Sequence, residues 1–269
     1  MPKLIAPPKP CIPLDQRDLK RITSAFDAGL EAVKDAEIRF PDYRGWLGDV
    51  ERCSDYRFER CPRPKVDDSY PPELAHTDYG RERVELLYRT LEHILKEGGV
   101  FESLSSGIRF RSDKYPRPEE YAKVYGCVKT SEAFNFARKI GRWKEENPQL
   151  HFRGKFYQSV TVFPAHNKLC LYVPFEGFGQ VMDILTAEKN SFNPIEFNHP
   201  IGVQVFPGVS AVIMSDEVGP SFDDRVQSLL DGVKDDMKKG GNFVRKAKAV
   251  LETDSLVGYY FTYLSDREK

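Results

Sequence analysis

The stretch of sequence from residue 138 to residue 168 is rich in side chains that could bind anions and move protons. Arginine binds phosphate or carboxylate through paired hydrogen bonds, while lysine and histidine exchange protons once their pKa values are shifted. No acidic residue occurs between Gln149 and Phe175. A solvated surface usually mixes both charge signs, so this bias favours a functional site. The candidate residues are Arg138, Lys139, Arg142, Lys144, His151, Arg153, Lys155, Tyr157, His166 and Lys168.

The spacing of these residues predicts which of them lie together. Arg138 and Arg142 are four residues apart on a predicted helix, so they share one helix face. Every second residue from His151 to Tyr157 would lie on one face of a strand that begins early. A turn at 164–167 would bring His166 and Lys168 to the far end of that strand. The alternative interpretation is the solvated edge of a sheet, where Lys and Arg discourage aggregation.

Other motifs give weaker indications of chemistry. The segment His76-Thr77-Asp78 matches the first half of a two-histidine, one-carboxylate iron site. Its place at a predicted helix start favours a capping role instead. The third ligand would be His151, His166 or His199. Asp223-Asp224 and Asp235-Asp236 resemble paired metal ligands, but an amphipathic helix accounts for them as a solvated face and a favourable charge at its N-terminus. No common nucleotide, metalloprotease or serine-hydrolase motif occurs.

Composition limits the class of protein and its compartment. Lys and Arg number 40 against 41 Asp and Glu, which gives no overall attraction to nucleic acid or to anionic membranes. The five cysteines form no CxxC pair and favour free thiols in a reducing compartment, although Cys53 and Cys61 could pair in an exported protein. No apolar run is long enough for a transmembrane helix. We therefore expect a soluble cytoplasmic protein, or one delivered into a host cytoplasm, with a peptide or protein partner and an oligomeric state that the sequence does not give.

Hydrophobic periodicity predicts an α+β fold, with a helical N-terminal half and an antiparallel sheet flanked by helices in the C-terminal half. The segments 40–70 and 103–120 are predicted to be irregular, the first with room for one short helical turn. The predicted helices are 16–33, 77–96, 131–143, 177–188, 221–239 and 243–251. The predicted strands are 155–163, 168–173, 202–206, 209–214 and 256–264. Residues 1–15 are predicted to form a flexible, proline-rich arm, and 16–269 one domain that could divide near 145–150 into a helical part and a sheet part.

From Lys155 onward, the order of elements resembles the phosphothreonine lyases of bacterial effectors and the related lyase domains of lanthipeptide synthetases. The resemblance rests on the strand Lys168-Leu169-Cys170-Leu171-Tyr172-Val173, the helix after it, the later strand pair and the long helix at 221–239. It covers about a hundred residues in pattern rather than in specific sequence. It implies a cofactor-independent elimination of phosphate from phosphoserine or phosphothreonine, with Lys168 as the base.

The resemblance also implies roles for neighbouring residues. Arg153 and Arg142 would hold the leaving phosphate, and a nearby histidine or Tyr157 would protonate it or stabilise the enolate. Cys170 stands where the effector enzymes carry a catalytic histidine. His166 or His151 would therefore have to supply the acid, or the activity would be lost.

Two alternative functions come from other features. A non-catalytic interaction protein is suggested by aromatic residues beside arginines in the segments predicted to be irregular, because exposed Tyr, Trp and Arg anchor many interfaces. These aromatic residues are Tyr43, Trp46, Tyr56, Phe58, Tyr70 and Tyr115. Binding of single-stranded nucleic acid is suggested by interleaved basic and aromatic residues, although the near-zero net charge argues against it. These are Arg109, Phe110, Arg111, Lys114, Tyr115 and Arg117.

Overall fold

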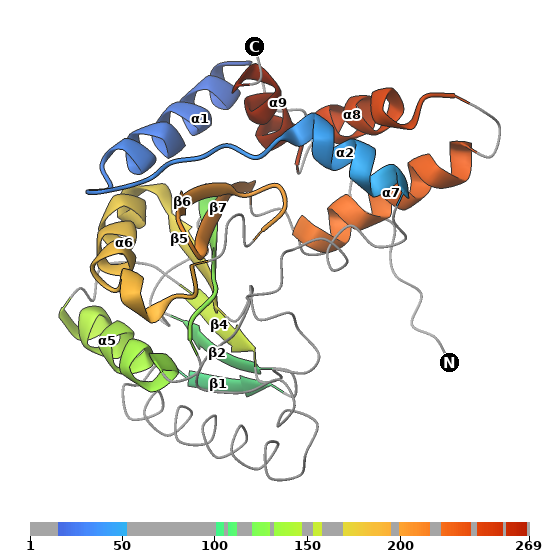
Figure 1. The fold of residues 1–269 in the computed structure, drawn as a ribbon. Helices are drawn as coiled ribbons and strands as arrows, with labels where there is room; N and C mark the ends of the chain where they lie inside the picture. Colours follow the sequence, from blue (N-terminus) through green and yellow to red (C-terminus); the bar gives the residue numbers. More distant parts are fainter. Residues whose placement is uncertain are drawn as a thin grey trace, which may run out of the picture.

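The architecture comes from a computed structural model (Figure 1). It describes residues 16–52, 101–104, 107–111, 120–129, 132–146, 153–157, 169–194, 199–215, 222–237, 241–254 and 257–267.

A seven-stranded sheet organises the fold, and every neighbouring pair in it is antiparallel. Its strands lie in the order β1-β2-β4-β5-β3-β7-β6. The strands are β1 (Phe101–Leu104), β2 (Gly107–Arg111), β3 (Glu120–Gly126), β4 (Arg153–Tyr157), β5 (Leu169–Pro174), β6 (Val203–Phe206) and β7 (Val209–Ser215). The sheet is thus assembled from three local hairpin-like pairs and the inserted strand β3, which lies between β5 and β7.

Helices pack against this sheet and against one another (Figure 1). They are α1 (Gln16–Glu31), α2 (Tyr43–Arg52), α5 (Ala133–Glu146), α6 (Phe175–Ala187), α7 (Phe222–Met237), α8 (Phe243–Thr253) and α9 (Gly258–Arg267). A short 3-10 turn, η3 (Lys189–Ser191), follows α6. These elements share one apolar core, in which the largest fully buried side chains include Tyr43, Tyr260, Phe26 and Phe136.

One face of the sheet is apolar and meets α5 and α6, which lie side by side in Figure 1. On β3 this face carries Ala122, Val124 and Gly126, and on β5 it carries the residues paired with them. Gly126 is needed here because a Cβ atom at this position would lie 2.8 Å from the ring of Phe192. Phe192 in turn meets Phe136 of α5 edge to face, with ring centroids 5.4 Å apart. The opposite face of β3 carries Tyr121, Lys123 and Tyr125, because side chains alternate along a strand.

Aromatic contacts join the N- and C-terminal helices. Phe26 of α1 stacks on Phe178 of α6, with centroids 5.5 Å apart, and meets Tyr263 of α9 edge to face. Tyr43 of α2 contacts Phe261 of α9 at 5.2 Å. Segments from both ends of the chain therefore bury one another's apolar faces.

The α+β prediction is confirmed, with an antiparallel sheet, flanking helices and a helical N-terminal part. The helices expected near 16–33, 131–143, 177–188, 221–239 and 243–251 are present with shifts of a few residues, as is the strand pair around Pro207 and Gly208. The expected pairing of 155–163 with 168–173 is confirmed for the part that is described, where β4 and β5 pair antiparallel, and the turn between them lies outside it. The predicted arm 1–15 and helix 77–96 lie outside the described residues. The assignment of 16–269 to one domain stays a prediction.

Two predictions were wrong because tertiary burial overrides local propensity. The segment 256–264 was expected to be a strand because of its aromatic residues, but α9 occupies it. This helix is buried almost all round, and a continuous apolar run does not distinguish a buried helix from a strand. The segment 40–70 was expected to be irregular with at most one short helical turn, but its start forms the ten-residue helix α2. The cap is Asp42, whose Oδ1 accepts a hydrogen bond from the Gly45 amide at 2.8 Å.

The sheet also begins earlier in the sequence than expected. The stretch 103–120 was predicted to be irregular, yet β1 and β2 form an antiparallel pair across residues 105–106. Strand β3 was not predicted at all, because Lys123 and Gly126 interrupt its apolar pattern. Both features matter for function, since β3 carries the candidate site and β2 extends the same face.

Candidate functional site

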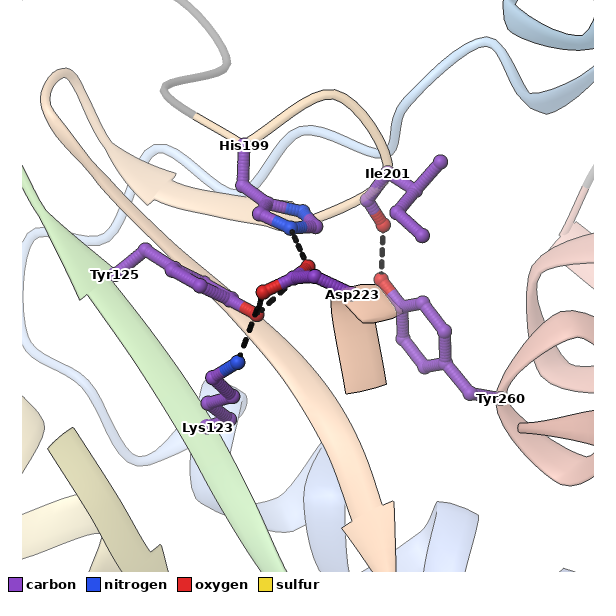
Figure 2. Close-up of polar contacts among 6 residues, drawn as sticks. All are labelled: Lys123, Tyr125, His199, Ile201, Asp223 and Tyr260. Carbon is purple, nitrogen blue, oxygen red and sulfur yellow. Dashed lines mark hydrogen bonds and ion pairs between the residues drawn. The ribbon is translucent and has the colours of Figure 1, made fainter. Parts of the chain in front are cut away.

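A buried cluster of four ionisable side chains lies on the polar face of β3 (Figure 2). Asp223 is its centre. Its Oδ2 lies 3.0 Å from Nζ of Lys123, and its Oδ1 lies 3.0 Å from Nε2 of His199. The hydroxyl of Tyr125 lies 3.3 Å from Oδ1 and 3.2 Å from Oδ2. We call Lys123, Tyr125, His199 and Asp223 the Asp223 cluster.

Three separate elements position these side chains. Lys123 and Tyr125 are two residues apart on β3 and therefore lie on the same face. Asp223 is in the first turn of α7, where the positive end of the helix dipole favours a carboxylate. His199 precedes β6 and begins a turn in which its carbonyl accepts the amide of Gly202 at 3.1 Å. The site therefore exists only when sheet, helix and turn have come together.

The turn that carries His199 is held on both sides. The hydroxyl of Tyr260, from α9, donates a hydrogen bond to the carbonyl of Ile201 (Figure 2). On the other side, Gly202 lies so close to β7 that a Cβ atom there would be 2.8 Å from Cβ of Ser210. The His199 ring stacks on Tyr125 with centroids 4.1 Å apart and planes inclined by 20°. The imidazole is thus fixed in both position and orientation.

Burial and mutual attraction together set the charges of the cluster. Burial by itself would raise the pKa of Asp223, but the Lys123 ammonium and the His199 hydrogen bond hold that pKa well below its usual range. Burial would lower the pKa of Lys123, but the neighbouring acidic groups, Asp223 foremost among them, together raise it. Burial, and then Asp223, raise the pKa of the Tyr125 hydroxyl. At neutral pH the cluster therefore holds an ammonium, a carboxylate and a neutral phenol.

This charge state determines which nitrogen of a neutral His199 carries hydrogen. An ionised Asp223 only accepts hydrogen bonds, so Nε2 of His199 must donate to it. Nδ1 is then left with a lone pair, and this buried atom has no hydrogen-bond partner among the residues that the structure describes. A carboxylate that orients an imidazole and leaves its other nitrogen available is the arrangement that makes histidine a general base.

Strand register connects the Asp223 cluster with the basic strand β4. Tyr125 pairs with Cys170 of β5, and Cys170 pairs with Lys155 of β4. Paired residues on neighbouring strands share a face, so half-buried Lys155 belongs to the face of the cluster. We call the positions Tyr125, Cys170, Lys155 and Arg109 the Tyr125 row. We call the positions Lys123, Tyr172, Arg153 and Arg111 the Lys123 row.

The structure brings some of the predicted site residues near the cluster and not others. Arg153, Lys155 and Tyr157 are in β4, as their spacing predicted. The sheet-edge alternative for this strand is wrong, because β2 and β5 flank it. Arg138 and Arg142 are in α5, and Arg142 is exposed on the helix that covers the apolar face. The roles expected for His151, His166 and Lys168 stay predictions, since these residues lie outside the described part of the chain.

The Asp223 cluster was missed at the sequence level. Asp223 was assigned to a solvated face, but its side chain is only 18% exposed and binds Lys123 and His199. Lys123 lies in a strand that was not predicted, and Tyr125 was not considered. His199 was considered only as a metal ligand. A lysine flanked by apolar and aromatic residues, as in Tyr-Ala-Lys-Val-Tyr, was the one local signal that pointed to a buried charge.

The aromatic residues proposed as interface anchors were tested in part. Tyr43 is fully buried and Trp46 is 8% exposed, so both belong to the core rather than to an exposed surface. Tyr56, Phe58, Tyr70 and Tyr115 lie outside the described residues, as do Lys114 and Arg117.

The described residues hold no group of three or more His, Cys, Asp or Glu side chains arranged to bind a metal ion. No helix among them has the length and apolar character needed to cross a bilayer.

Solved structures that resemble the chain at low identity include two effector proteins. The chain is similar to an effector protein from Pseudomonas syringae pv. tomato strain DC3000, with 12% identity and a TM-score of 0.46 over 91% of this chain and 98% of that one. It is also similar to an effector protein from Pseudomonas syringae pv. syringae strain 61, with 17% identity and a TM-score of 0.38 over 86% of this chain and 92% of that one. No family model and no curated protein matches the sequence. At these values the likenesses do not extend to a shared activity.

Proposed function

We propose that the protein is a cofactor-independent carbon–oxygen lyase that eliminates phosphate from phosphoserine or phosphothreonine side chains of a peptide or protein. The observation that carries the proposal is the contact of Asp223 with Nε2 of His199, which leaves the buried Nδ1 without a hydrogen-bond partner in the described part of the chain. A buried polar atom without a partner is costly to keep, and such atoms concentrate where a ligand or reaction requires them.

In the proposed reaction, Nδ1 of His199 removes the α-proton of the phosphorylated residue. The electron pair of the Cα–H bond forms the Cα=Cβ double bond, and the Cβ–O bond breaks, so that its electrons leave with the phosphate. The proton held by His199 then returns to the departing phosphate. The products are a dehydrated residue and inorganic phosphate, and neither an oxidant nor a reductant is consumed.

Each remaining member of the site has a physical role in this reaction. Lys123 is kept as an ammonium by Asp223 and stabilises the negative charge that develops on the substrate carbonyl as the α-proton leaves. The Tyr125 hydroxyl stays protonated and donates to Asp223, which helps to hold that carboxylate against His199. Lys155, in the Tyr125 row, attracts the leaving phosphate.

Because the cluster is buried, the substrate needs a route to the base. Nδ1 of His199 is shielded from solvent, whereas the Asp223 side chain is partly exposed to solvent. We propose that substrate enters beside Asp223, and that binding opens the protein next to the imidazole. A dry site strengthens the electrostatic interactions on which the elimination depends.

The test is mass spectrometry of phosphoserine and phosphothreonine peptides incubated with the wild-type protein and with His199→Gln. The glutamine amide can still donate to Asp223 in place of Nε2, but it offers no base. We expect the wild type to release the mass of phosphoric acid, and His199→Gln to be slower by about 10²- to 10⁴-fold. Loss of HPO₃ alone would mean hydrolysis, and an unreacted peptide panel would refute the proposal.

A second variant protects this test against simple misfolding. Tyr125→Phe keeps the ring that stacks on His199 and removes only the hydroxyl donor. It should fold and retain reduced elimination. If both variants melt at the temperature of the wild type and both react at its rate, the Asp223 cluster is not the reacting site.

A further inference from the structure

A pocket of about 600 Å³ lies between α1 and α9, two helices that are neighbours in Figure 1. This volume is in the range of protein sites that hold small molecules. None of the lining residues belongs to the Asp223 cluster, so the pocket is separate from the candidate site. The lining residues are Lys20, Thr23 and Asp27 of α1, and Thr262, Tyr263, Asp266 and Arg267 of α9.

The carboxylate of Asp27 is already bound by two donors from α9. The Tyr263 hydroxyl donates to its Oδ1 at 2.7 Å, and Nη2 of Arg267 donates to its Oδ2. Burial, and then the hydrogen bond to Asp27, raise the pKa of the Tyr263 hydroxyl, so this donor stays protonated at neutral pH. Asp27 therefore serves to hold Tyr263 and Arg267 in place.

The guanidinium of Arg267 is oriented but keeps donors for a ligand. Its Cζ lies 5.2 Å from the centre of the Phe40 ring and 5.2 Å from the centre of the Tyr263 ring. A guanidinium has five N–H donors, and toward the described residues only Nη2 donates, to Asp27. The side chain remains 43% exposed. Because the guanidinium is held in advance, less entropy is lost when its remaining donors bind a carboxylate or phosphate.

Lys20 brings a second positive charge to the same pocket. It is exposed, and its ammonium makes no ion pair with any residue that the structure describes. Lys20 precedes Asp27 by seven residues, which is about two turns of helix, so both lie on one face of α1 about 10 Å apart along its axis. The hydroxyls of Thr23 and Thr262 donate to backbone carbonyls of their own helices. The two cations are therefore the groups through which the pocket would recognise a ligand.

We propose that the pocket between α1 and α9 binds a small organic anion, whose carboxylate or phosphate groups contact Arg267 and Lys20. The pocket is much larger than a single inorganic ion, which favours a molecule with a carbon skeleton. Asp266 is an acidic residue of the lining and opposes an anion, so removal of its charge strengthens binding. The proposal does not depend on the lyase reaction, because it shares no residue with the Asp223 cluster.

The test is isothermal titration calorimetry of the full chain with four probes at low ionic strength, because salt screens exposed charges. The probes are glycerol 3-phosphate, citrate, inorganic phosphate and, as the uncharged control, glycerol. We expect at least one of the two organic anions to bind, and glycerol not to bind. The organic anion that binds more tightly identifies the preferred group as phosphate or carboxylate. Binding of neither would overturn the proposal, and inorganic phosphate that binds as tightly as both would overturn the assignment to an organic ligand.

Variants locate the bound anion. Lys20→Gln should weaken binding about tenfold, and so should Arg267→Lys, which keeps a positive charge beside Asp27 but loses the planar set of donors. Asp266→Asn should strengthen binding several-fold. Arg21→Gln is the matched control, because it removes one positive charge from exposed α1 outside the lining and should leave the affinity unchanged.

Melting temperatures confirm that these variants fold, and Lys20→Gln changes an exposed side chain that the fold does not require. Wild-type affinity in both Lys20→Gln and Arg267→Lys would overturn the proposal. An equal loss of affinity in Lys20→Gln and Arg21→Gln would also overturn it, because it would show general attraction by charge rather than contact within this pocket.

Discussion

Nζ of Lys123 lies 3.0 Å from Oδ2 of Asp223, although a hundred positions separate the two residues in the sequence. The contact joins the strand between β5 and β7 to the first turn of α7. Both side chains are largely removed from solvent, and a buried charge that loses its partner costs much more than an exposed one. This ion pair therefore links the stability of the fold to the integrity of the site.

Asp223→Asn should destabilise the protein strongly, because it leaves the Lys123 ammonium buried without its counter-charge. We expect a loss of about 3 to 5 kcal/mol in the free energy of unfolding, measured by urea denaturation. The double variant Lys123→Met with Asp223→Leu removes both charges. Its loss in the free energy of unfolding should be much smaller than the sum of the losses in Lys123→Met alone and Asp223→Leu alone. Additive losses would show that the two charges do not interact.

The pH dependence of stability should reflect the same pair. The pKa of Asp223 is lowered in the folded protein, so its contribution is complete above the unfolded value of about 3.9 and is lost as the pH falls below it. The pKa of Lys123 is raised, so its contribution is complete below about 10.4 and is lost as the pH rises further. The difference in unfolding free energy between wild type and Asp223→Asn should therefore shrink at low pH and at high pH. A difference that stays constant from pH 3 to pH 7 would contradict this account.

The limits of the sequence prediction follow from how the Asp223 cluster is built. Helices α1, α6, α7 and α8 follow from local periodicity, and so do the strand pairs β4–β5 and β6–β7. Strand β3 has both faces buried, and a lysine at its centre, so its pattern contains no amphipathic alternation. Its ion-pair partner is Asp223, which in turn contacts His199. No spacing rule connects such distant positions, and they become visible only when the chain has folded.

The basic strand β4 illustrates the opposite case. Its β-branched and aromatic residues predicted a strand at 155–163, and the alternation of Arg153, Lys155 and Tyr157 predicted one shared face if that strand began early, as it does. The alternation did not predict which strand lies beside β4. That strand is β2, and its register pairs Arg111 with Arg153. Two residues that are unremarkable in separate segments thus form a pair only through tertiary structure.

Tyr260→Phe should weaken the site from a distance. It removes the hydroxyl that donates to the Ile201 carbonyl, and so loosens the turn that begins at His199. We expect a loss of about 1 to 3 kcal/mol in stability, because a buried carbonyl loses its partner. We also expect a fall in kcat greater than any change in KM. The matched control is Tyr263→Phe on the same helix, whose hydroxyl donates to Asp27 instead. Equal effects of the two variants on kcat would contradict the role of Tyr260.

Trp46→Ala should behave as a core substitution and not as the loss of a binding surface. Trp46 is 8% exposed and stacks with Phe261 of α9 at a centroid distance of 6.1 Å. Truncation should lower the free energy of unfolding by about 3 to 5 kcal/mol. Arg44→Ala, two positions earlier on α2 and exposed, is the comparison. A Trp46→Ala protein as stable as Arg44→Ala would show that the indole is not packed in the core.

The most direct test of the central claim uses a phosphoserine peptide with deuterium at the α-carbon of the reacting residue. If His199 removes this hydrogen, the product will have lost phosphoric acid together with the deuterium, and the reaction will be slower than with the unlabelled peptide. In His199→Gln the same loss should be slower by about 10²- to 10⁴-fold. A product that has lost phosphate but keeps its deuterium would contradict elimination and would assign the Asp223 cluster to a different chemistry.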